Sequence, residues 1–429
     1  MKILLVHPNY QQSIGERSHI SFFKKIDYKF ITKPLNFDIL SALTPDTHSI
    51  EVVDEKKNKI DFAKKYDLVG ITSLTSDIVR AYEIADFFKE RKIIVVMGGC
   101  HPSVMPEEAK QHADSVVIGE AEEIWPNLLR DAEFGMLKPF YRNENPISPD
   151  LIPVIDHKTN SDNSFIGRIQ STRGCNCSCE FCNILNLTNR DVFRKRPIND
   201  VVNELKNMPH KLLYFYDESL TLDVDYSKEL FKKIKPLNKK YICNGNTDVL
   251  SSDDELIKLS KEAGCVIWAV GFESLSQKTI DSIGKTTNKV EDYPLVVEKI
   301  KENGLLIHGN FIFGFDDDTL EVFDKTFEII DQWNLDSAEF NILMPFPGTR
   351  LFNRLDKENR LLTKNWTEYR YGNVVFQPKN MSPEELKTGV YDLLKRFYSK
   401  KKIVKRLISN FRLGFYHFSM TWLNNSSYL

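Results

Sequence analysis

The feature that most constrains this chain is a short segment with four cysteines. They lie within residues 175–182 of a 429-residue chain that contains only seven cysteines. Cys175, Cys179 and Cys182 follow the spacing Cys-x3-Cys-x2-Cys, and Cys177 lies between the first two. So dense a group of thiols indicates a metal site.

Two kinds of metal site compete for these thiols. A structural zinc site usually takes two closely spaced cysteine pairs or a later histidine pair, but only the isolated Cys243 and Cys265 follow this segment. An iron–sulfur cluster is held by thiolates on a tight loop. Three thiolates on a cluster of four irons leave one iron open, so the segment favours a cluster with one exchangeable position.

The segment resembles the signature of the radical S-adenosylmethionine (radical SAM) enzymes. The resemblance implies that Cys175, Cys179 and Cys182 hold a 4Fe–4S cluster, with Phe181 directly before the last ligand. In that family the open iron binds the amino and carboxylate groups of S-adenosylmethionine, and an electron from the cluster releases a 5′-deoxyadenosyl radical. Proteins delegate such chemistry to cofactors. Cys177 occupies a variable position of the family loop and is expected to be a bystander.

Composition excludes several classes of protein. The 58 basic and 60 acidic residues are too balanced to argue for nucleic acid as a bulk partner, and 41% hydrophobic content suffices for two or three domains. The remaining cysteines do not form a disulfide framework, and the apolar run after Met1 is too short for a signal peptide. No run reaches the roughly 18 apolar residues of a membrane-spanning helix. We therefore expect a protein of the reducing cytoplasm.

Short apolar runs alternate with helix-like stretches over residues 1–140. The strand candidates are 3–6, 49–53, 68–72, 93–97 and 115–118. Apolar strands between helices predict a parallel sheet covered on both faces, which is a doubly wound α/β domain. Such sheets bind ligands beyond the carboxyl ends of their strands, and glycines there let the backbone approach a ligand closely.

Residues 97–108 and 116–122 resemble the cobalamin-binding, Rossmann-like domain that precedes the barrel in a large radical SAM subfamily. The resemblance implies cobalamin contacts from Ser73, Thr75, Gly98, Gly99, His101, Gly119 and Glu120. No Asp-x-His-x-x-Gly follows the first strand, so no histidine is expected below the cobalt, and in that subfamily cobalamin binds with its nucleotide tail detached. His48 precedes the second strand and lies at the wrong end of the sheet. A degenerate domain without cofactor is the alternative.

A second domain is expected over residues 164–375, after a polar linker at 141–163. Its strand candidates are 165–170, 212–216, 241–243, 266–270, 308–313 and 338–343. Six βα units match the partial, TIM-type (βα)6 barrel of radical SAM proteins. Reacting groups should gather at the carboxyl ends of these strands.

Polar residues at those ends are the candidate contacts of S-adenosylmethionine. A carboxylate of Asp217 or Glu218 suits the ammonium of the methionine moiety, and Asn244 could bond to the ribose or the methionine carboxylate, or could simply belong to a turn. The resemblance implies ribose or methionine contacts in the Gly-x-Glu-Ser of the fourth strand and adenine contacts in the fifth. The predicted set is Phe181, Asp217, Glu218, Asn244, Glu273, Ser274, Gly309, Ile312 and Gly314.

Residues 376–429 are predicted to form a C-terminal helical extension. After Asp392 the chain has eight basic residues and no acidic one, and large aromatic residues follow from Phe411 onwards. Such a segment can lie on an anionic membrane surface, or it can dock on the barrel and close its open side. We expect docking.

The resemblance implies a cobalamin-dependent radical SAM enzyme, with methylation of an unactivated carbon through methylcobalamin as the preferred interpretation. A radical cyclase or rearrangement enzyme, with or without cobalamin, is the first alternative, because fold does not settle the reaction. A non-catalytic, metal-stabilised binding module is the second. The expected partners are a small-molecule or lipid substrate and an electron donor such as flavodoxin or ferredoxin, with no nucleic acid. Peripheral membrane contact would come only through the tail.

Overall fold

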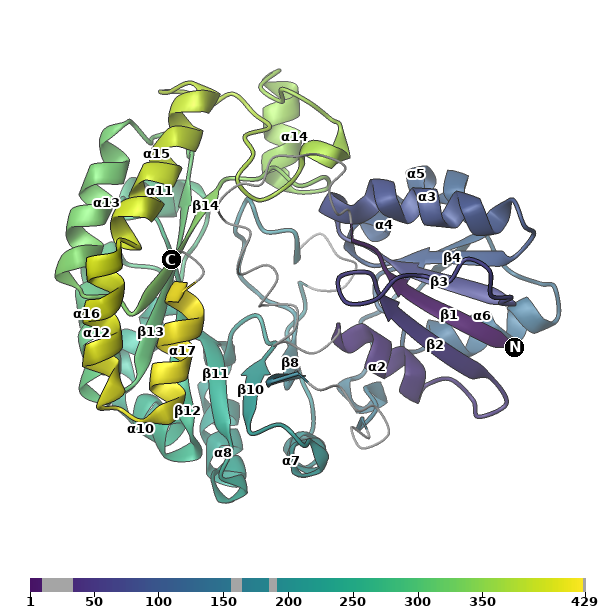
Figure 1. Ribbon diagram of the computed structural model, residues 1–429, viewed down its shortest axis with the longest axis horizontal. Helices are drawn as coiled ribbons and strands as arrows, with labels where there is room; N and C mark the ends of the chain where they lie inside the picture. The colour runs from purple at the N-terminus through teal and green to yellow at the C-terminus, as the bar shows by residue number, and fades with distance from the viewer. Residues whose placement is uncertain (10–33, 156–163, 185–190, 427–429) are drawn as a thin grey trace.

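The computed structural model describes residues 1–9, 34–155, 164–184 and 191–426. Two six-stranded parallel sheets lie side by side, the first formed by the N-terminal part of the chain and the second by the central part (Figure 1). This α/β architecture is the predicted fold class.

The first sheet has the strand order β2-β1-β3-β4-β5-β6. Its strands are β1 (Lys2–His7), β2 (Ser49–Asp54), β3 (Leu68–Thr72), β4 (Ile94–Gly98), β5 (Ser115–Ile118) and β6 (Phe140–Arg142). The order reverses between β1 and β3, which makes their carboxyl ends the switch point where such sheets bind ligands. The short β6 was not predicted, because it has only three residues and buries only Tyr141.

Helices cover both faces of the first sheet, and alternate strand residues pack against them. Leu4 and Val6 belong to a cluster on the face of α3 and α5, whereas Ile3 and Leu5 pack with Trp125 on the face of α2 and α6. The helices are α2 (Leu35–Ala42), α3 (Ile78–Lys89), α4 (Cys100–Val104), α5 (Pro106–His112) and α6 (Ile124–Glu133). This is the doubly wound arrangement that the sequence predicted.

The second sheet is an open barrel with the order β14-β13-β12-β11-β10-β7. Its strands are β7 (Ile166–Ile169), β10 (Leu212–Phe215), β11 (Lys240–Gly245), β12 (Cys265–Glu273), β13 (Leu306–Phe313) and β14 (Ser337–Ile342). The outer layer consists of α7 (Ile198–Asn207), α8 (Val224–Ile234), α9 (Thr247–Ser252), α10 (Asp254–Ala263), α11 (Gln277–Ser282), α12 (Tyr293–Glu302), α13 (Glu321–Gln332) and α14 (Arg350–Lys357). A short antiparallel pair, β8 (Thr172–Arg173) and β9 (Arg194–Lys195), flanks the cysteine segment.

Three helices form the C-terminal extension: α15 (Pro383–Phe397), α16 (Lys400–Phe411) and α17 (Phe415–Ser426). A capping box between Ser382 and Glu385 begins α15. The extension docks on the barrel, as expected, and α17 buries Met420 against Ile166 and Leu306 at the amino ends of the strands. Figure 1 shows α16 and α17 on the side of the barrel away from the first sheet.

Candidate active site

The carboxyl ends of the two sheets face a cavity of about 810 Å³, which we call the central cavity. The first sheet and its loops line it with His7, Asp54, Thr72, Ser73, Gly98, Gly99, Glu120 and Glu122. The barrel lines it with Arg168, Gln170, Arg173, Tyr214, Tyr216, Asp217, Glu218 and Asn244. Doubly wound sheets and βα barrels both hold ligands at this end of their strands, so the cavity lies where both sheets present their functional groups.

The loops of the first sheet present backbone to the central cavity. Gly99 has φ 98°, and a Cβ there would lie 2.6 Å from Thr72 Oγ1 and 2.9 Å from Ser73 N, so only glycine fits. Ser103 Oγ donates to Gly99 O at 2.7 Å and accepts from Gly119 N at 2.9 Å, which ties the ends of β4 and β5 together. This rigid, glycine-bearing edge is suited to a large ligand that approaches the backbone closely.

The predicted cobalamin contacts divide into two groups. Ser73, Gly98, Gly99 and Glu120 line the central cavity. Thr75 and His101 are buried behind this edge, and Gly119 N donates to Ser103 Oγ. The His101 ring is fully buried, with Nδ1 3.1 Å from Thr75 Oγ1 and its ring centroid 5.2 Å from that of Trp366. Thr75 and His101 therefore support the edge from behind.

A buried ion-pair network joins the first sheet to the start of the cysteine segment. Arg173 Nη1 lies 3.1 Å from Glu120 Oε1, and its Nη2 lies 2.6 Å from Glu122 Oε1. Arg194 Nη1 also pairs with Glu120, at 2.7 Å. Sequence reasoning missed this network, although Glu120 and Glu122 stand at a strand end and Arg173 stands two residues before Cys175.

The cysteine segment follows β8 and contacts the turn after α11. A hydrogen bond from Cys177 and the nearby charge of Lys285 lower the pKa of Cys175 to about 6, whereas burial raises the pKa of Cys179 to about 11. Within the described ranges, no three metal-binding side chains converge on the position of one ion. An iron–sulfur cluster does not require that convergence, because each cysteine binds a different iron.

Backbone contacts hold the segment in place. Glu180 N donates to Ile283 O at 2.8 Å, and Leu351 N donates to Glu180 O at 3.1 Å. Gly284 has φ 73°, and a Cβ there would come within 2.8 Å of Ser178 O. The turn after α11 and the first turn of α14 thus hold the cysteine segment between them.

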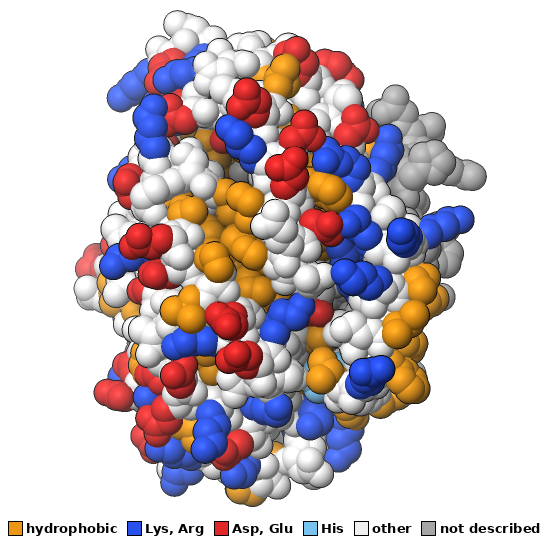
Figure 2. Space-filling model, turned by 90° about the vertical axis from the view of Figure 1, so that its left-hand side faces the viewer, with side chains coloured by type: hydrophobic (Ala, Val, Ile, Leu, Met, Phe, Trp, Pro, Cys, Tyr) orange, Lys and Arg blue, Asp and Glu red, His pale blue; other side chains and the backbone are white. Residues whose placement is uncertain are grey.

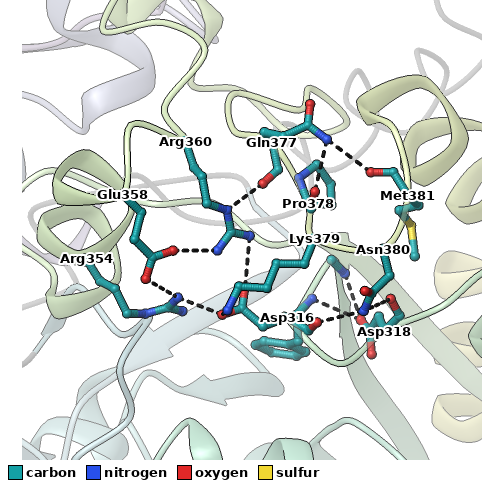
Figure 3. Close-up of polar contacts among 12 residues, drawn as sticks. Asp316, Asp318, Arg354, Glu358, Arg360, Gln377, Pro378, Lys379, Asn380 and Met381 are labelled. Carbon is teal, nitrogen blue, oxygen red and sulfur yellow. Dashed lines mark hydrogen bonds and ion pairs between the residues drawn. The ribbon is translucent and has the colours of Figure 1, made fainter.

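Arg354 on α14 extends this support into a charged network (Figure 3). Its Nε lies 2.5 Å from Glu180 Oε1, and its Nη1 lies 2.8 Å from Asp316 Oδ2. Asp316 also pairs with Arg360 at 2.9 Å and with Lys379 at 2.9 Å. The network links the cysteine segment, the loop after β13 and the segment before α15.

Asp217 is held inside the protein by the start of the cysteine segment. Its Oδ1 accepts from Ser171 Oγ at 2.7 Å and from Thr172 N at 2.5 Å, and burial raises the pKa of the carboxyl. Glu218 and Asn244 line the central cavity, and Asn244 Nδ2 donates to Asp217 O at 2.8 Å. Of the two predicted carboxylates, Glu218 is therefore the better placed to meet a ligand, and Asp217 acts as a brace.

Glu273 lies at the carboxyl end of β12, beside the cysteine segment. It has φ 61°, an unusual conformation for a residue with a side chain, and its Oε1 accepts from Lys285 Nζ at 2.9 Å. The carboxylate of Glu273 and the nearby thiols raise the pKa of Lys285 against the opposing effect of its burial. Ser274 follows directly, and its Oγ accepts from Ser276 N at 3.2 Å.

The predicted adenine segment lies at the carboxyl end of β13. A Cβ on Gly309 would lie 2.9 Å from the Phe311 ring and 3.2 Å from the Phe272 ring, so this glycine is required for packing. Gly314 has φ 102°, and its N donates to Asp318 Oδ2 at 2.9 Å. Ile312 is partly buried, and Phe181 lies 6.2 Å from Phe315 between ring centroids.

Comparisons with known proteins bear on this arrangement. Residues 169–330 match the radical SAM superfamily, 26–129 match the B12 binding domain, and 349–418 match a domain of unknown function. The bacteriochlorophyllide d C-12(1)-methyltransferase of Chlorobaculum tepidum is 30% identical over 421 residues, which cover 95% of this chain and 89% of that protein. The chain belongs to the cobalamin-binding radical SAM enzymes.

Other members of this family differ in reaction. The anaerobic magnesium-protoporphyrin IX monomethyl ester cyclase of Cereibacter sphaeroides is 25% identical over 94% of this chain and 71% of its own. The structure of the radical SAM methyltransferase TsrM from Kitasatospora setae, with cobalamin and a 4Fe–4S cluster bound, has a TM-score of 0.68 at 18% identity, over 94% of this chain and 86% of that one. This structural likeness shows a shared fold.

The family sets the cofactors of this radical SAM enzyme: a 4Fe–4S cluster, S-adenosylmethionine and cobalamin. Membership also removes the alternative of a non-catalytic binding module. No helix in the described part of the chain is long and apolar enough to cross a bilayer.

Proposed function

We propose that this enzyme transfers a methyl group to an unactivated carbon of a small molecule held in the central cavity. The observation that carries the proposal is that one cavity is lined by the carboxyl ends of both the B12-binding sheet and the barrel. Relatives at 30% and 31% identity are methyltransferases of bacteriochlorophyllide d. When bound, the cluster with S-adenosylmethionine supplies a hydrogen-abstracting radical, and cobalamin supplies the methyl group.

The predicted site residues of this chain fit an enzyme that holds a cluster, S-adenosylmethionine and cobalamin. We assign the cluster to Cys175, Cys179 and Cys182, and we assign to Cys177 the hydrogen bond that stabilises the Cys175 thiolate. The buried pair of Glu273 and Lys285 fixes the charge beside these thiols. Among the other predicted residues, Glu218 and Asn244 offer an edge to a cofactor on the barrel side, and Ser73, Gly98 and Gly99 offer one on the side of the first sheet.

We also propose that cobalamin binds without a histidine below the cobalt. His7 is the histidine at the end of β1, and its Nδ1 lies 3.4 Å from Asp54 Oδ1 while its ring packs against Phe37. A residue held in this way is suited to lining the cavity. A base-off absorption spectrum that His7→Ala leaves unchanged would support this assignment.

Two further inferences concern the setting of the reaction. In the part of the chain that the structure describes, the cysteines form no disulfide, including the buried Cys243 and Cys265, which suits the reducing cytoplasm that the sequence predicted. The cluster must receive an electron from outside the chain, and a small protein such as a flavodoxin or ferredoxin is the expected donor. Restoration of turnover by either protein with its reductase would test this.

Labelled S-adenosylmethionine tests the methyl transfer. Anaerobically reconstituted enzyme with cobalamin and S-adenosylmethionine deuterated in its methyl group would be incubated with a small-molecule extract from a strain that lacks the enzyme. The proposal predicts a product that carries the intact trideuteromethyl group, together with 5′-deoxyadenosine. A product that loses hydrogen and gains no label would instead identify a cyclase.

The C-terminal extension carries a second, separate proposal. The inward face of α16 docks on the barrel: Asn410 Nδ2 donates to Asp336 Oδ1 at 2.7 Å, and the Arg406 guanidinium lies 3.7 Å from the centre of the Phe397 ring. The outward face has a stripe of exposed apolar side chains at helical spacing, continued into α17: Val404, Ile408, Phe411, Phe415 and Trp422. The two sequence alternatives for this segment therefore apply to different faces.

We propose that this outward face rests on an anionic lipid surface. Among the described residues, the side chains of Lys400, Lys401 and Arg412 have no hydrogen-bond or ion-pair partner. In the region of α16 and α17, at the right-hand edge of Figure 2, basic side chains lie directly beside hydrophobic ones. Each basic residue near an anionic lipid surface contributes about 1 kcal/mol of attraction, which salt screens.

Vesicle sedimentation tests the lipid contact. The intact protein should sediment with vesicles that contain phosphatidylglycerol and not with pure phosphatidylcholine. Replacement of both Phe411 and Phe415 by serine should abolish sedimentation without changing the melting temperature. The matched control is Phe134→Ser, since Phe134 is 69% exposed on the first domain. Equal sedimentation with neutral vesicles, or self-association that the double variant removes, would overturn the proposal.

A further inference from the structure

An unpaired guanidinium lies in the barrel wall of the central cavity. Arg168 is the third residue of β7, is half-buried and lines the cavity. Its Nε is buried and has no hydrogen-bond partner, and no carboxylate in the described ranges lies within ion-pairing distance of it. The other buried arginines of this region are paired: Arg173 binds Glu120 and Glu122, and Arg196 binds Glu204 at 2.7 Å.

The guanidinium points toward the cavity. In the parallel register Arg168 pairs with Tyr214, one residue before the last pair of the two strands. Its guanidinium carbon nevertheless lies 5.2 Å from the ring centre of Tyr216. Tyr216 lies two residues nearer the carboxyl end, so the side chain of Arg168 runs along the strands to the mouth of the barrel. A ring face satisfies none of the five N–H donors of a guanidinium.

Aromatic side chains form a wall next to this charge. Tyr216 is 49% exposed and packs edge to face on Tyr214, with 5.8 Å between ring centroids. Asn244 fixes Tyr214, because its Nδ2 donates to the Tyr214 hydroxyl at 3.0 Å. The cavity therefore offers a cation on β7, with a fixed ring and an exposed ring at the carboxyl end of the neighbouring strand β10.

We propose that Arg168 binds an anionic group of the substrate, a carboxylate or a phosphate, while Tyr216 packs against the adjoining apolar part. An unpaired arginine is suited to an oxyanion because its planar donors match two oxygens at once. The substrate class is thus an organic anion with a flat or apolar body. This inference rests on the proposed function, because it takes the central cavity as the substrate site.

The position of Arg168 separates this subsite from the cluster. β7 is an edge strand, three strands from β12, which ends at Glu273 beside the cysteines. At about 4.8 Å between strands, roughly 14 Å of sheet lies between them. None of the described residues that line the central cavity is a cysteine of the 175–182 segment. The carboxylate of S-adenosylmethionine, which belongs at the cluster, is therefore a poorer partner for Arg168 than the substrate.

A matched pair of probes tests the inference in the reconstituted enzyme with all three cofactors. Naphthalene-1-acetate and naphthalene-1-acetamide have nearly the same shape and differ in charge. Equilibrium dialysis should show at least tenfold tighter binding of the acid by the unchanged protein. Arg168→Gln should remove that preference and leave binding of the amide unchanged, Arg168→Lys should keep part of it, and Tyr216→Ala should weaken both probes equally.

Controls separate the substrate from the cofactors. Lys57→Gln changes another cation that lines the central cavity, on the side of the first sheet, and should leave the preference for the acid intact. Arg168→Gln should also keep the cobalamin content and the affinity for S-adenosylmethionine. Loss of the cobalamin content or of the affinity for S-adenosylmethionine would assign Arg168 to that cofactor and overturn the inference. Equal binding of the two probes by the unchanged protein, or no binding of either, would also overturn it. Failure of methyl transfer alone would refute the proposed function and leave these results standing.

Discussion

The two ends of the barrel differ in what their side chains contact. At the amino end Ile166, Leu212, Leu306 and Met420 are all at most 7% exposed and form one apolar cluster. At the carboxyl end the chain keeps an unpaired Arg168 and places Glu273 in a left-handed conformation. Strained or unpaired residues do not stabilise a fold and are kept where function requires them. The amino end therefore serves stability, and the carboxyl end serves chemistry.

Substitutions in the cysteine segment, at the carboxyl end of the barrel, are expected to have the largest effect. Cys175→Ala, Cys179→Ala or Cys182→Ala should each abolish the cluster and activity, because each removes one of three proposed ligands. Cys177→Ala should keep the iron content. Iron and sulfide analysis after anaerobic reconstitution measures this. Loss of iron in Cys177→Ala together with retention in Cys175→Ala would refute the ligand assignment.

The amino end should show the opposite behaviour. Met420→Ala leaves a cavity in a packed cluster, and such changes cost about 2 to 5 kcal/mol of unfolding free energy. The melting temperature should fall while iron and cobalamin contents per folded protein stay unchanged. Met136→Ala is the control, since Met136 is 62% exposed and should have no effect. If Met420→Ala lost iron or cobalamin at a temperature low enough for the variant to stay folded, the amino end would not serve stability alone.

Gly99→Ala tests the same division in the first sheet. The new Cβ would meet Thr72 and the Ser73 backbone at less than 3.0 Å, whereas Gly135, which also has positive φ, has open space around it. Gly135→Ala should cost about 1 kcal/mol from backbone strain alone. Gly99→Ala should cost more and should also lower cobalamin uptake. Equal effects of the two substitutions on stability and on cobalamin would contradict the role given to this edge.

The smallest expected effect is a dependence of stability on pH from His308, inside the barrel. Burial lowers its pKa from 6.5 to about 4, and its Nδ1 lies 2.8 Å from Ser337 Oγ. The unfolded chain then binds more protons than the native one below pH 6.5, so stability present above that pH is lost as the pH falls toward 4. The slope should be about 1 kcal/mol per pH unit. His308→Asn should flatten the melting temperature between pH 7 and 5.5, and an unchanged slope would refute this origin.

Sequence reasoning was strongest where function depends on local spacing or on alternation. The spacing of the cysteines was enough to predict the radical SAM family. Most strands of both sheets could be predicted because buried parallel strands form continuous apolar runs. Contacts between residues far apart in the sequence could not be predicted. Glu180 and Arg354 are 174 residues apart, and Glu120 and Arg173 are 53 apart.

Position at a strand end was also an incomplete guide to the site. Asp217 stands at the expected place, but Ser171 and Thr172 occupy its oxygens. Gly309 matched a ligand-binding pattern, yet aromatic packing requires its small size. Arg168 was missed because one basic residue in a strand does not show, without the fold, that no carboxylate lies near it.

In the proposed function, one cavity serves both the radical chemistry of the barrel and the cobalamin of the first sheet. Single-turnover incubation of the reconstituted, reduced enzyme with S-adenosylmethionine labelled by carbon-13 in its methyl group tests this without a substrate. We predict that the label appears on the enzyme-bound cobalamin, with S-adenosylhomocysteine formed in equal amount. Protein that holds cobalamin and cleaves S-adenosylmethionine to 5′-deoxyadenosine, but never places the label on cobalamin, would contradict the claim.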